Sequence, residues 1–126
     1  MSNVAVYAQS DPVITLASSS CILDPPAGIG SCTVNSNEVA DGDAPPVCLS
    51  WSYDTSLFSV VVTVAGSQKS SGFCVDNDFL FDFTVSYIAS GCSSTVSTLT
   101  FTAHNGVGNT NAQFSINVKC AITPPP

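Results

Sequence analysis

The feature that most constrains the fold is a period-two alternation of apolar and polar residues that recurs along the chain. In "FLFDFTVSYI" the apolar positions are Phe79, Phe81, Phe83, Val85 and Tyr87. In "LFSVVVTVA" the same spacing selects Phe58, Val60, Val62 and Val64. Because side chains alternate between the two faces of a strand, each segment predicts a β-strand with one face in the core. No helical periodicity is seen, so the chain is predicted to be all-β.

Weaker alternations predict strands at residues 4–7, 13–17, 32–35, 47–53, 96–103 and 112–120. Clusters of Gly, Pro, Asn and Asp separate them and predict loops. Seven or eight short strands in 126 residues are typical of an antiparallel β-sandwich or barrel. We expect one domain over residues 1–120, followed by a Pro-rich tail or linker over residues 121–126, "AITPPP".

Six cysteines are spread along the whole chain: Cys21, Cys32, Cys48, Cys74, Cys92 and Cys120. No two of them lie two to four residues apart, and His104 has no neighbouring ligand, so the spacing favours disulfides over zinc. Disulfides form and persist in oxidising compartments. The chain is therefore predicted to be secreted, extracellular or displayed at a cell surface.

The charge of the chain excludes two classes of partner. It carries two Lys, no Arg and a formal net charge of −7, so it lacks the basic surface that binds phosphate. We expect neither nucleic acid nor anionic lipid as a partner. No run of 18 apolar residues occurs, so membrane insertion is not expected either.

Two stretches resemble known extracellular modules. The pattern A-x-N-x-x-G followed by F-x-I-x-V, from Ala103 to Val118, resembles the last hairpin of immunoglobulin-like domains and the end of PKD and hyalin-repeat modules. The stretch "VNSNEVADGDAPPVCLSWSYD" is similar to the PKD segment in which a D-G-D loop precedes a strand with a core tryptophan. The resemblance implies an immunoglobulin-like sandwich. The expected core residues are Trp51, Phe81, Phe83, Phe101, Phe114, Ile116 and Val118.

The sequence departs from true immunoglobulin domains in its cysteines. Phe101 replaces the intersheet cysteine, and Leu99 stands where a tyrosine is usual. Six cysteines allow 15 pairings. The strand order that the resemblance implies favours Cys21–Cys32, Cys48–Cys74 and Cys92–Cys120 among them. The interval between Trp51 and Leu99 is longer than a minimal module needs, so an extra hairpin or long loop is expected there.

Few residues offer catalytic or metal-binding chemistry. His104 is predicted to point outward beside a turn, and no catalytic motif accompanies it, so we expect no enzyme and no catalytic residue. The acids cluster around the Trp51 strand (Glu38, Asp41, Asp43, Asp54) and around "CVDNDFLFD" (Asp76, Asp78, Asp82). Carboxylates grouped in loops suit Ca²⁺, which makes Asp41, Asp43, Asp76 and Asp78 candidate ligands, although solvated loop acids are the commoner case. No other cofactor is expected.

Two functions fit these residues. The first is a non-catalytic structural or adhesive module that contacts other extracellular proteins or copies of itself. In that case the apolar N-terminal segment "NVAVYAQSDPVITLA" could exchange between copies and build surface fibres, although a first strand paired within its own domain is the commoner case. The alternative is a carbohydrate- or other ligand-binding module with Tyr7, Tyr53 or Tyr87 as a stacking platform. Low charge and cross-linking favour the first function.

Overall fold

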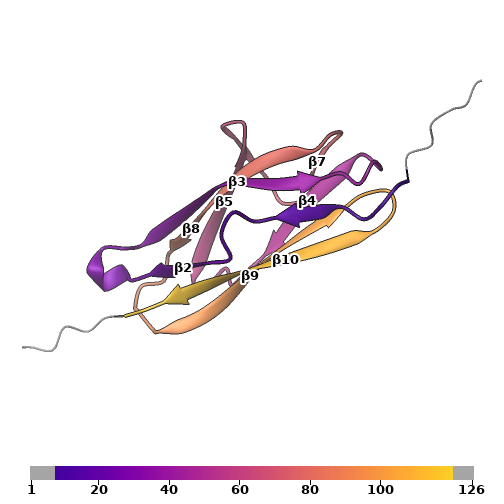
Figure 1. Cartoon of the computed structure of the whole chain (residues 1–126). Helices are drawn as coiled ribbons and strands as arrows, with labels where there is room; N and C mark the ends of the chain where they lie inside the picture. The colour runs from indigo at the N-terminus through magenta and orange to yellow at the C-terminus, as the bar shows by residue number, and fades with distance from the viewer. Residues whose placement is uncertain (1–7, 121–126) are drawn as a thin grey trace, which may run out of the picture.

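The chain forms a β-sandwich of two five-stranded sheets, seen in a computed structural model that describes residues 8–120 (Figure 1). The strand predicted over residues 4–7, Tyr7 and the tail over residues 121–126 lie outside the described residues. Of the described residues, only Pro25–Ala27 form a helical turn, the 3₁₀ turn η1. No helix among them is long and apolar enough to cross a membrane.

The first sheet, sheet A, has the strand order β1-β3-β8-β5-β6, and all its pairs are antiparallel. Its strands are β1 (Val13–Thr15), β3 (Ser31–Ala40), β8 (Phe79–Tyr87), β5 (Phe58–Val64) and β6 (Ser67–Lys69). The second sheet, sheet B, has the order β2-β10-β9-β4-β7. Its strands are β2 (Ser20–Leu23), β10 (Asn109–Val118), β9 (Thr95–His104), β4 (Val47–Ser52) and β7 (Phe73–Val75).

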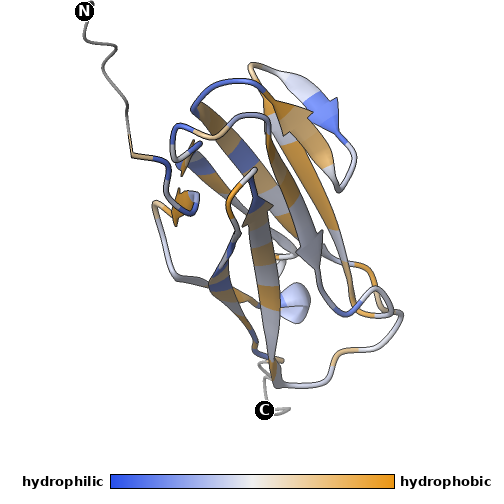
Figure 2. Cartoon of the chain, turned by 90° about the vertical axis from the view of Figure 1, so that its right-hand side faces the viewer, coloured by the Kyte–Doolittle hydropathy of each residue, from blue (hydrophilic) through white to orange (hydrophobic). Residues whose placement is uncertain are grey.

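The core lies between the sheets and follows the predicted alternation (Figure 2). Of the seven predicted core residues, Phe81, Phe83, Phe101, Phe114, Ile116 and Val118 are buried. Phe83 and Phe101, from opposite sheets, place their ring centroids 4.9 Å apart. Trp51 is a correction: it is only half-buried, because it lies near the end of β4, where it packs against the core beside Phe73 and Phe101.

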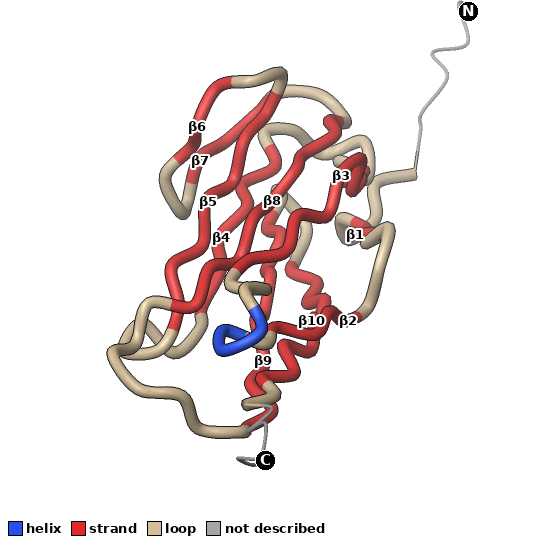
Figure 3. The backbone as a smooth tube through the Cα atoms, turned by 90° about the vertical axis from the view of Figure 1, so that its left-hand side faces the viewer, coloured by secondary structure: helices blue, strands red, loops and turns tan. Residues whose placement is uncertain are grey.

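The first strand of the sandwich is divided between the two sheets. β1 pairs antiparallel with β3, and after Leu16 the chain crosses over so that β2 pairs with β10 (Figure 3). The β2–β10 pair is parallel, whereas the sequence predicted antiparallel strands throughout. The difference arises because β2 continues in the direction of β1 after changing sheets, and that is also the direction of β10.

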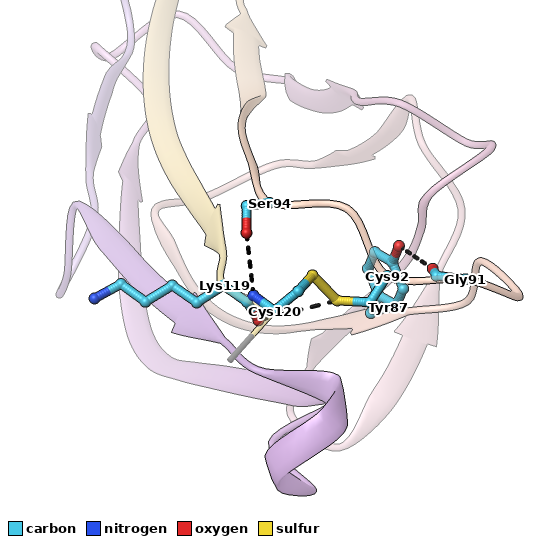
Figure 4. Close-up of a disulfide and its surroundings, with 6 residues drawn as sticks. All are labelled: Tyr87, Gly91, Cys92, Ser94, Lys119 and Cys120. Atoms are coloured by element: carbon cyan, nitrogen blue, oxygen red, sulfur yellow. Dashed lines mark hydrogen bonds between the residues drawn. A yellow bond between two sulfur atoms is a disulfide. The ribbon is translucent and has the colours of Figure 1, made fainter. Parts of the chain in front are cut away.

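Three disulfides join Cys21 to Cys32, Cys48 to Cys74 and Cys92 to Cys120, the pairing that the sequence favoured. Cys48 and Cys74 lie directly opposite each other in β4 and β7. The Cys92–Cys120 bridge ties the end of β10 to the loop before β9, and the backbone N–H of Cys120 donates to Ser94 Oγ at 3.2 Å (Figure 4). The two ends of the described chain lie at opposite ends of the sandwich (Figure 1).

The sequence missed three short strands. β2, β6 and β7 have three or four residues each, too few for alternation to be read. β6 extends sheet A and β7 extends sheet B, so the chain also changes sheets between them. These two strands fill the long interval in which an extra hairpin or loop was expected.

Candidate functional site

The most unusual local structure surrounds residues 10–17, which we call the first-strand segment. It runs from one end of the sandwich along its side and contains β1. Two buried asparagines outside the segment, Asn105 and Asn37, hold its two ends. Neither residue was predicted to have a role beyond the hairpin pattern that contains Asn105.

Asn105, in the turn between β9 and β10, holds the start of the segment. Its Nδ2 donates to the carbonyl oxygens of Ser10 and Asp41, each at 2.8 Å. Its Oδ1 accepts from the backbone N–H groups of Val107 at 2.9 Å and Gly108 at 3.0 Å. A side-chain amide has two N–H donors and two good acceptor positions, so all four are used. Asn105 is only 3% exposed, and its hydrogen bonds fix Ser10 against two loops.

Two glycines make room for the backbone of Ser10 and Asp11. The N–H of Ser10 donates to the carbonyl oxygen of Gly42 at 2.9 Å. A Cβ atom at Gly42 would overlap the Ser10 carbonyl oxygen, and one at Gly108 would overlap the Asp11 carboxylate. Gly42 also has a φ of 65°, which side chains disfavour. We call Ser10, Asp41, Gly42, Asn105 and Gly108 the N-terminal clasp.

Asn37 holds the end of the segment from inside a β-bulge. The register between β3 and β8 shifts between Val34 and Asn37, and Ser36 adopts a φ of 62°. This turns the Asn37 side chain inward, where its Nδ2 donates to the carbonyl oxygens of Val34 and Phe81. Its Oδ1 accepts from the N–H of Ala17 at 2.9 Å. Asn37 is fully buried, so this amide is a fixed attachment point.

Between the two asparagines the segment is held lightly. β1 pairs with β3 over three residues, from Val13 opposite Ala40 to Thr15 opposite Glu38. Ile14 and Leu16 pack partly against the core, while Val13 and Thr15 are exposed. The next residues, 17–20, are exposed, and Cys21 is then fixed to Cys32 in β3. The segment is therefore a unit bounded by a covalent bridge.

The structure brings only some of the predicted calcium ligands together. Asp41 and Asp78 are neighbours, because Asp78 Oδ1 accepts from the Asp41 N–H at 2.8 Å, and Asp41 Oδ1 accepts from the Asp43 N–H at 2.9 Å. Within residues 8–120 no three His, Cys, Asp or Glu side chains form a group that could hold a metal ion. The calcium site, including Asp76, stays a prediction.

Asp54 is the acid whose environment changes its pKa. The hydroxyl and the backbone N–H of Ser56 both donate to Asp54 Oδ1 in the loop after β4. These hydrogen bonds, the hydroxyl first, lower the pKa of Asp54 because they stabilise its charged form. The carboxylate is fully exposed, and its hydrogen bonds to Ser56 stabilise the turn after β4.

The residues considered for catalysis and sugar stacking are placed as follows. His104 is exposed at the end of β9, as predicted, and its Nδ1 contacts Asn109 Oδ1 across the hairpin. Tyr53 and Tyr87 are half-buried against the core, and the Tyr87 hydroxyl donates to the carbonyl oxygen of Gly91 (Figure 4). Among residues 8–120, every Phe, Tyr and Trp side chain is at least half-buried.

Solved structures with this fold include proteins of several kinds. The CooA pilin subunit from enterotoxigenic Escherichia coli aligns with a TM-score of 0.57 at 15% identity, covering 91% of this chain and all of that one. The PapD-like domain 7 of human CEP192 aligns with a TM-score of 0.54 at 8% identity, covering 98% and 94%.

A family 123 glycoside hydrolase from Clostridium perfringens aligns with a TM-score of 0.56 at 8% identity, but over only 28% of that enzyme. No protein-family model and no curated protein matches the sequence. At these identities the likeness concerns the fold, which is an immunoglobulin-like β-sandwich.

Proposed function

We propose that this chain is a non-catalytic extracellular module that works through protein contacts, and that copies of it join into surface fibres by exchanging first-strand segments. The observation that carries the proposal is how this segment is attached. The groups that hold it, on Gly42, Asn37, Asn105 and β3, all lie outside the segment. A segment from a second copy can therefore make the same contacts.

Three features support an extracellular role. Three disulfides cross-link the described residues and leave no free cysteine among them. Cross-linking of this density is typical of secreted and surface domains. The fold is also that of the CooA pilin subunit, and that likeness is one of fold.

The chemistry of the site supports a non-catalytic role. His104 is the only histidine of the chain, and its Nδ1 contacts an amide rather than a nucleophile or a carboxylate. The buried polar side chains of the described chain, Asn37 and Asn105, carry no charge and are fully hydrogen-bonded. Both side chains bind backbone groups of the first-strand segment, at Ala17 and Ser10, and so serve to hold a strand rather than to carry out a reaction.

The exchange is bounded by the Cys21–Cys32 bridge. Residues before Cys21 can leave their own sandwich, whereas β2 is fixed by the bridge and by its pairing with β10. Ser18 and Ser19, which are exposed and lie between Ala17 and β2, would then act as the hinge. Exchange of an identical element conserves its contacts and so costs little free energy. Non-reciprocal exchange links each copy to the next and produces a fibre.

A cross-link between β1 and β3 tests the exchange directly. Thr15 and Glu38 lie opposite each other and are both exposed, so Thr15→Cys combined with Glu38→Cys creates a pair within bonding reach. In a monomer the new disulfide lies within one chain. In an exchanged oligomer it joins two chains, so oxidised oligomers should run as a ladder on a non-reducing denaturing gel.

The control is Thr15→Cys alone, which has no partner on β3 and should give no ladder beyond a trace of dimer. A wild-type chain that stays monomeric at the highest attainable concentration would contradict the proposal. An oligomer whose oxidised double variant runs as single chains would also contradict it, because the segments would then be paired within their own copies.

A further inference from the structure

One half of the outer edge of sheet B has no partner strand. β2 pairs with β10 only over Ser115–Val118, because the chain before β2 belongs to sheet A. Among the described residues, no strand pairs with β10 over residues 109–114 on the side opposite β9. This stretch, which we call the β10 edge, is therefore unpaired, although β1 of sheet A lies near β10.

The orientation of the open backbone groups follows from the neighbouring hydrogen bonds. The N–H of Ser115 donates to Ser19 and that of Lys119 donates to Leu23, both away from β9. Backbone groups alternate in direction along a strand, so the N–H and C=O groups of Asn109, Asn111 and Gln113 point to the same outer side. Unpaired groups of this kind are a template for another strand.

Several other sheet edges carry features that block strand addition, although the outer side of β5 over residues 58–61 and the outer side of β2 also have no partner strand among the described residues. β6 and β7 have only three residues each, and β6 contains Lys69. β1 is equally short and follows Pro12. The free part of β3 is bridged by Cys32 to Cys21 and ends at the bulge. The β10 edge has no proline and no charged residue, and its register with β9 is continuous.

The β10 edge and the neighbouring strand β9 carry no charged side chain of their own. Residues 83–118 contain no Asp, Glu, Lys or Arg, in a chain whose net charge is −7. Thr98, Thr100 and Thr102 lie on the outer face of β9, and the Thr102 hydroxyl donates to Asn111 Oδ1 at 2.8 Å. A second copy can therefore pair along residues 109–114 without bringing the acidic loops together, and the Asp11 carboxylate lies beside Gly108, just before this stretch.

We propose that the β10 edge pairs antiparallel with the β10 edge of a second copy, with Asn111 opposite Asn111 and Asn109 opposite Gln113. Each of these three pairs exchanges two backbone hydrogen bonds, about six in all. The amide side chains of Asn109, Asn111 and Gln113 share the outer face, where opposed amides can bond to each other. The pairing is self-complementary, as a two-fold dimer requires, and it joins the two B sheets into one.

This dimer uses a different edge from the proposed segment exchange and does not depend on it. Asn111→Pro tests it, because the N–H of Asn111 points away from β9; within the fold the substitution removes only the exposed side-chain hydrogen bond from Thr102. Asn111→Lys tests it through charge. We expect either substitution to weaken dimerisation on the order of tenfold to a hundredfold, measured by sedimentation equilibrium.

The matched control is Thr100→Lys, which adds the same charge to the same face on the interior strand β9 and should leave dimerisation unchanged. Amide hydrogen exchange gives a second measurement. The amides of Asn111 and Gln113 should become protected as concentration rises, whereas those of Thr110 and Ala112, which face β9, should be protected throughout. A monomeric wild type, unprotected Asn111 and Gln113 amides in the dimer, or dissociation by Thr100→Lys would overturn the proposal.

Discussion

Asn105 is the residue whose replacement tests the N-terminal clasp most directly. Asn105→Ala removes four hydrogen bonds, two from Nδ2 to the carbonyl oxygens of Ser10 and Asp41 and two to Oδ1 from the N–H groups of Val107 and Gly108. Each is worth about 1 kcal/mol net, and more where the partner is left buried without a bond. Water can reach part of the network, so we expect the free energy of unfolding to fall by about 2 to 4 kcal/mol.

The measurement is urea unfolding followed by the fluorescence of Trp51, the single tryptophan of the chain. Trp51 is half-buried between two phenylalanine rings, so its emission should change on unfolding. The matched control is Asn77→Ala, which removes an exposed amide and should cost less than about 0.5 kcal/mol. A loss below about 1 kcal/mol for Asn105→Ala would refute the reasoning, because it would mean that the amide is not essential to the clasp.

Asn105→Asp separates the two halves of the same network. The new carboxyl keeps the acceptor for Val107 and Gly108 but faces the carbonyl oxygens of Ser10 and Asp41, so its charged form is disfavoured. Its pKa in the folded state should therefore lie above the unfolded value of about 3.9. Since the folded state then binds more protons, the variant should lose stability as the pH rises from about 4 towards neutrality, relative to the wild type.

Further predictions concern the core, the bridges, the metal and Asp54. Phe101→Ala should lower the free energy of unfolding by about 3 to 5 kcal/mol, and Trp51→Ala by less because Trp51 is half-buried; equal losses in urea unfolding would place Trp51 in the core after all. Replacing Cys92 and Cys120 together by Ser should cost about 3 kcal/mol, given a sequence separation of 28 residues, and thermal unfolding at constant pH would measure it. A chelator should leave the melting temperature unchanged, whereas a rise on adding Ca²⁺ that Asp78→Asn abolishes would establish the calcium site. Ser56→Ala should raise the pKa of Asp54 towards its ordinary value in an NMR titration, and an unchanged pKa would show that the Ser56 hydroxyl is not the main cause.

The core strands could be predicted from the sequence, because a strand with one buried face has apolar residues at every second position. β8 is the clearest case, since Phe79, Phe81, Phe83 and Val85 are all buried as predicted. The disulfide pairing could also be predicted, from the strand order that the resemblance implies. That order places cysteines that are distant in the sequence at the same end of the sandwich. The pairing of β2 with β10 could not be predicted, since a four-residue strand takes its partner from what the rest of the fold leaves open.

The roles of the two asparagines of the candidate site could not be predicted from the sequence, for a different reason. Asn37 and Asn105 lie in polar stretches that read as loop or strand end, and nothing local indicates that their side chains are buried. Their partners Ala17, Phe81 and Ser10 are between 20 and 95 residues away. Only the packed sandwich brings these groups together, so the burial of an amide is a tertiary property.

The order of the three disulfides determines how the sandwich would respond to a pulling force. The bridges enclose three separate loops that follow one another along the chain, from Cys21 to Cys32, Cys48 to Cys74 and Cys92 to Cys120. Tension applied at the two described ends, which lie at opposite ends of the molecule, passes through the sulfur atoms and bypasses each loop. Only residues 8–21, 32–48 and 74–92 can be drawn out. The β9–β10 hairpin carries no load, so a stretched copy would keep this hairpin covalently closed and would extend to less than half of its contour length.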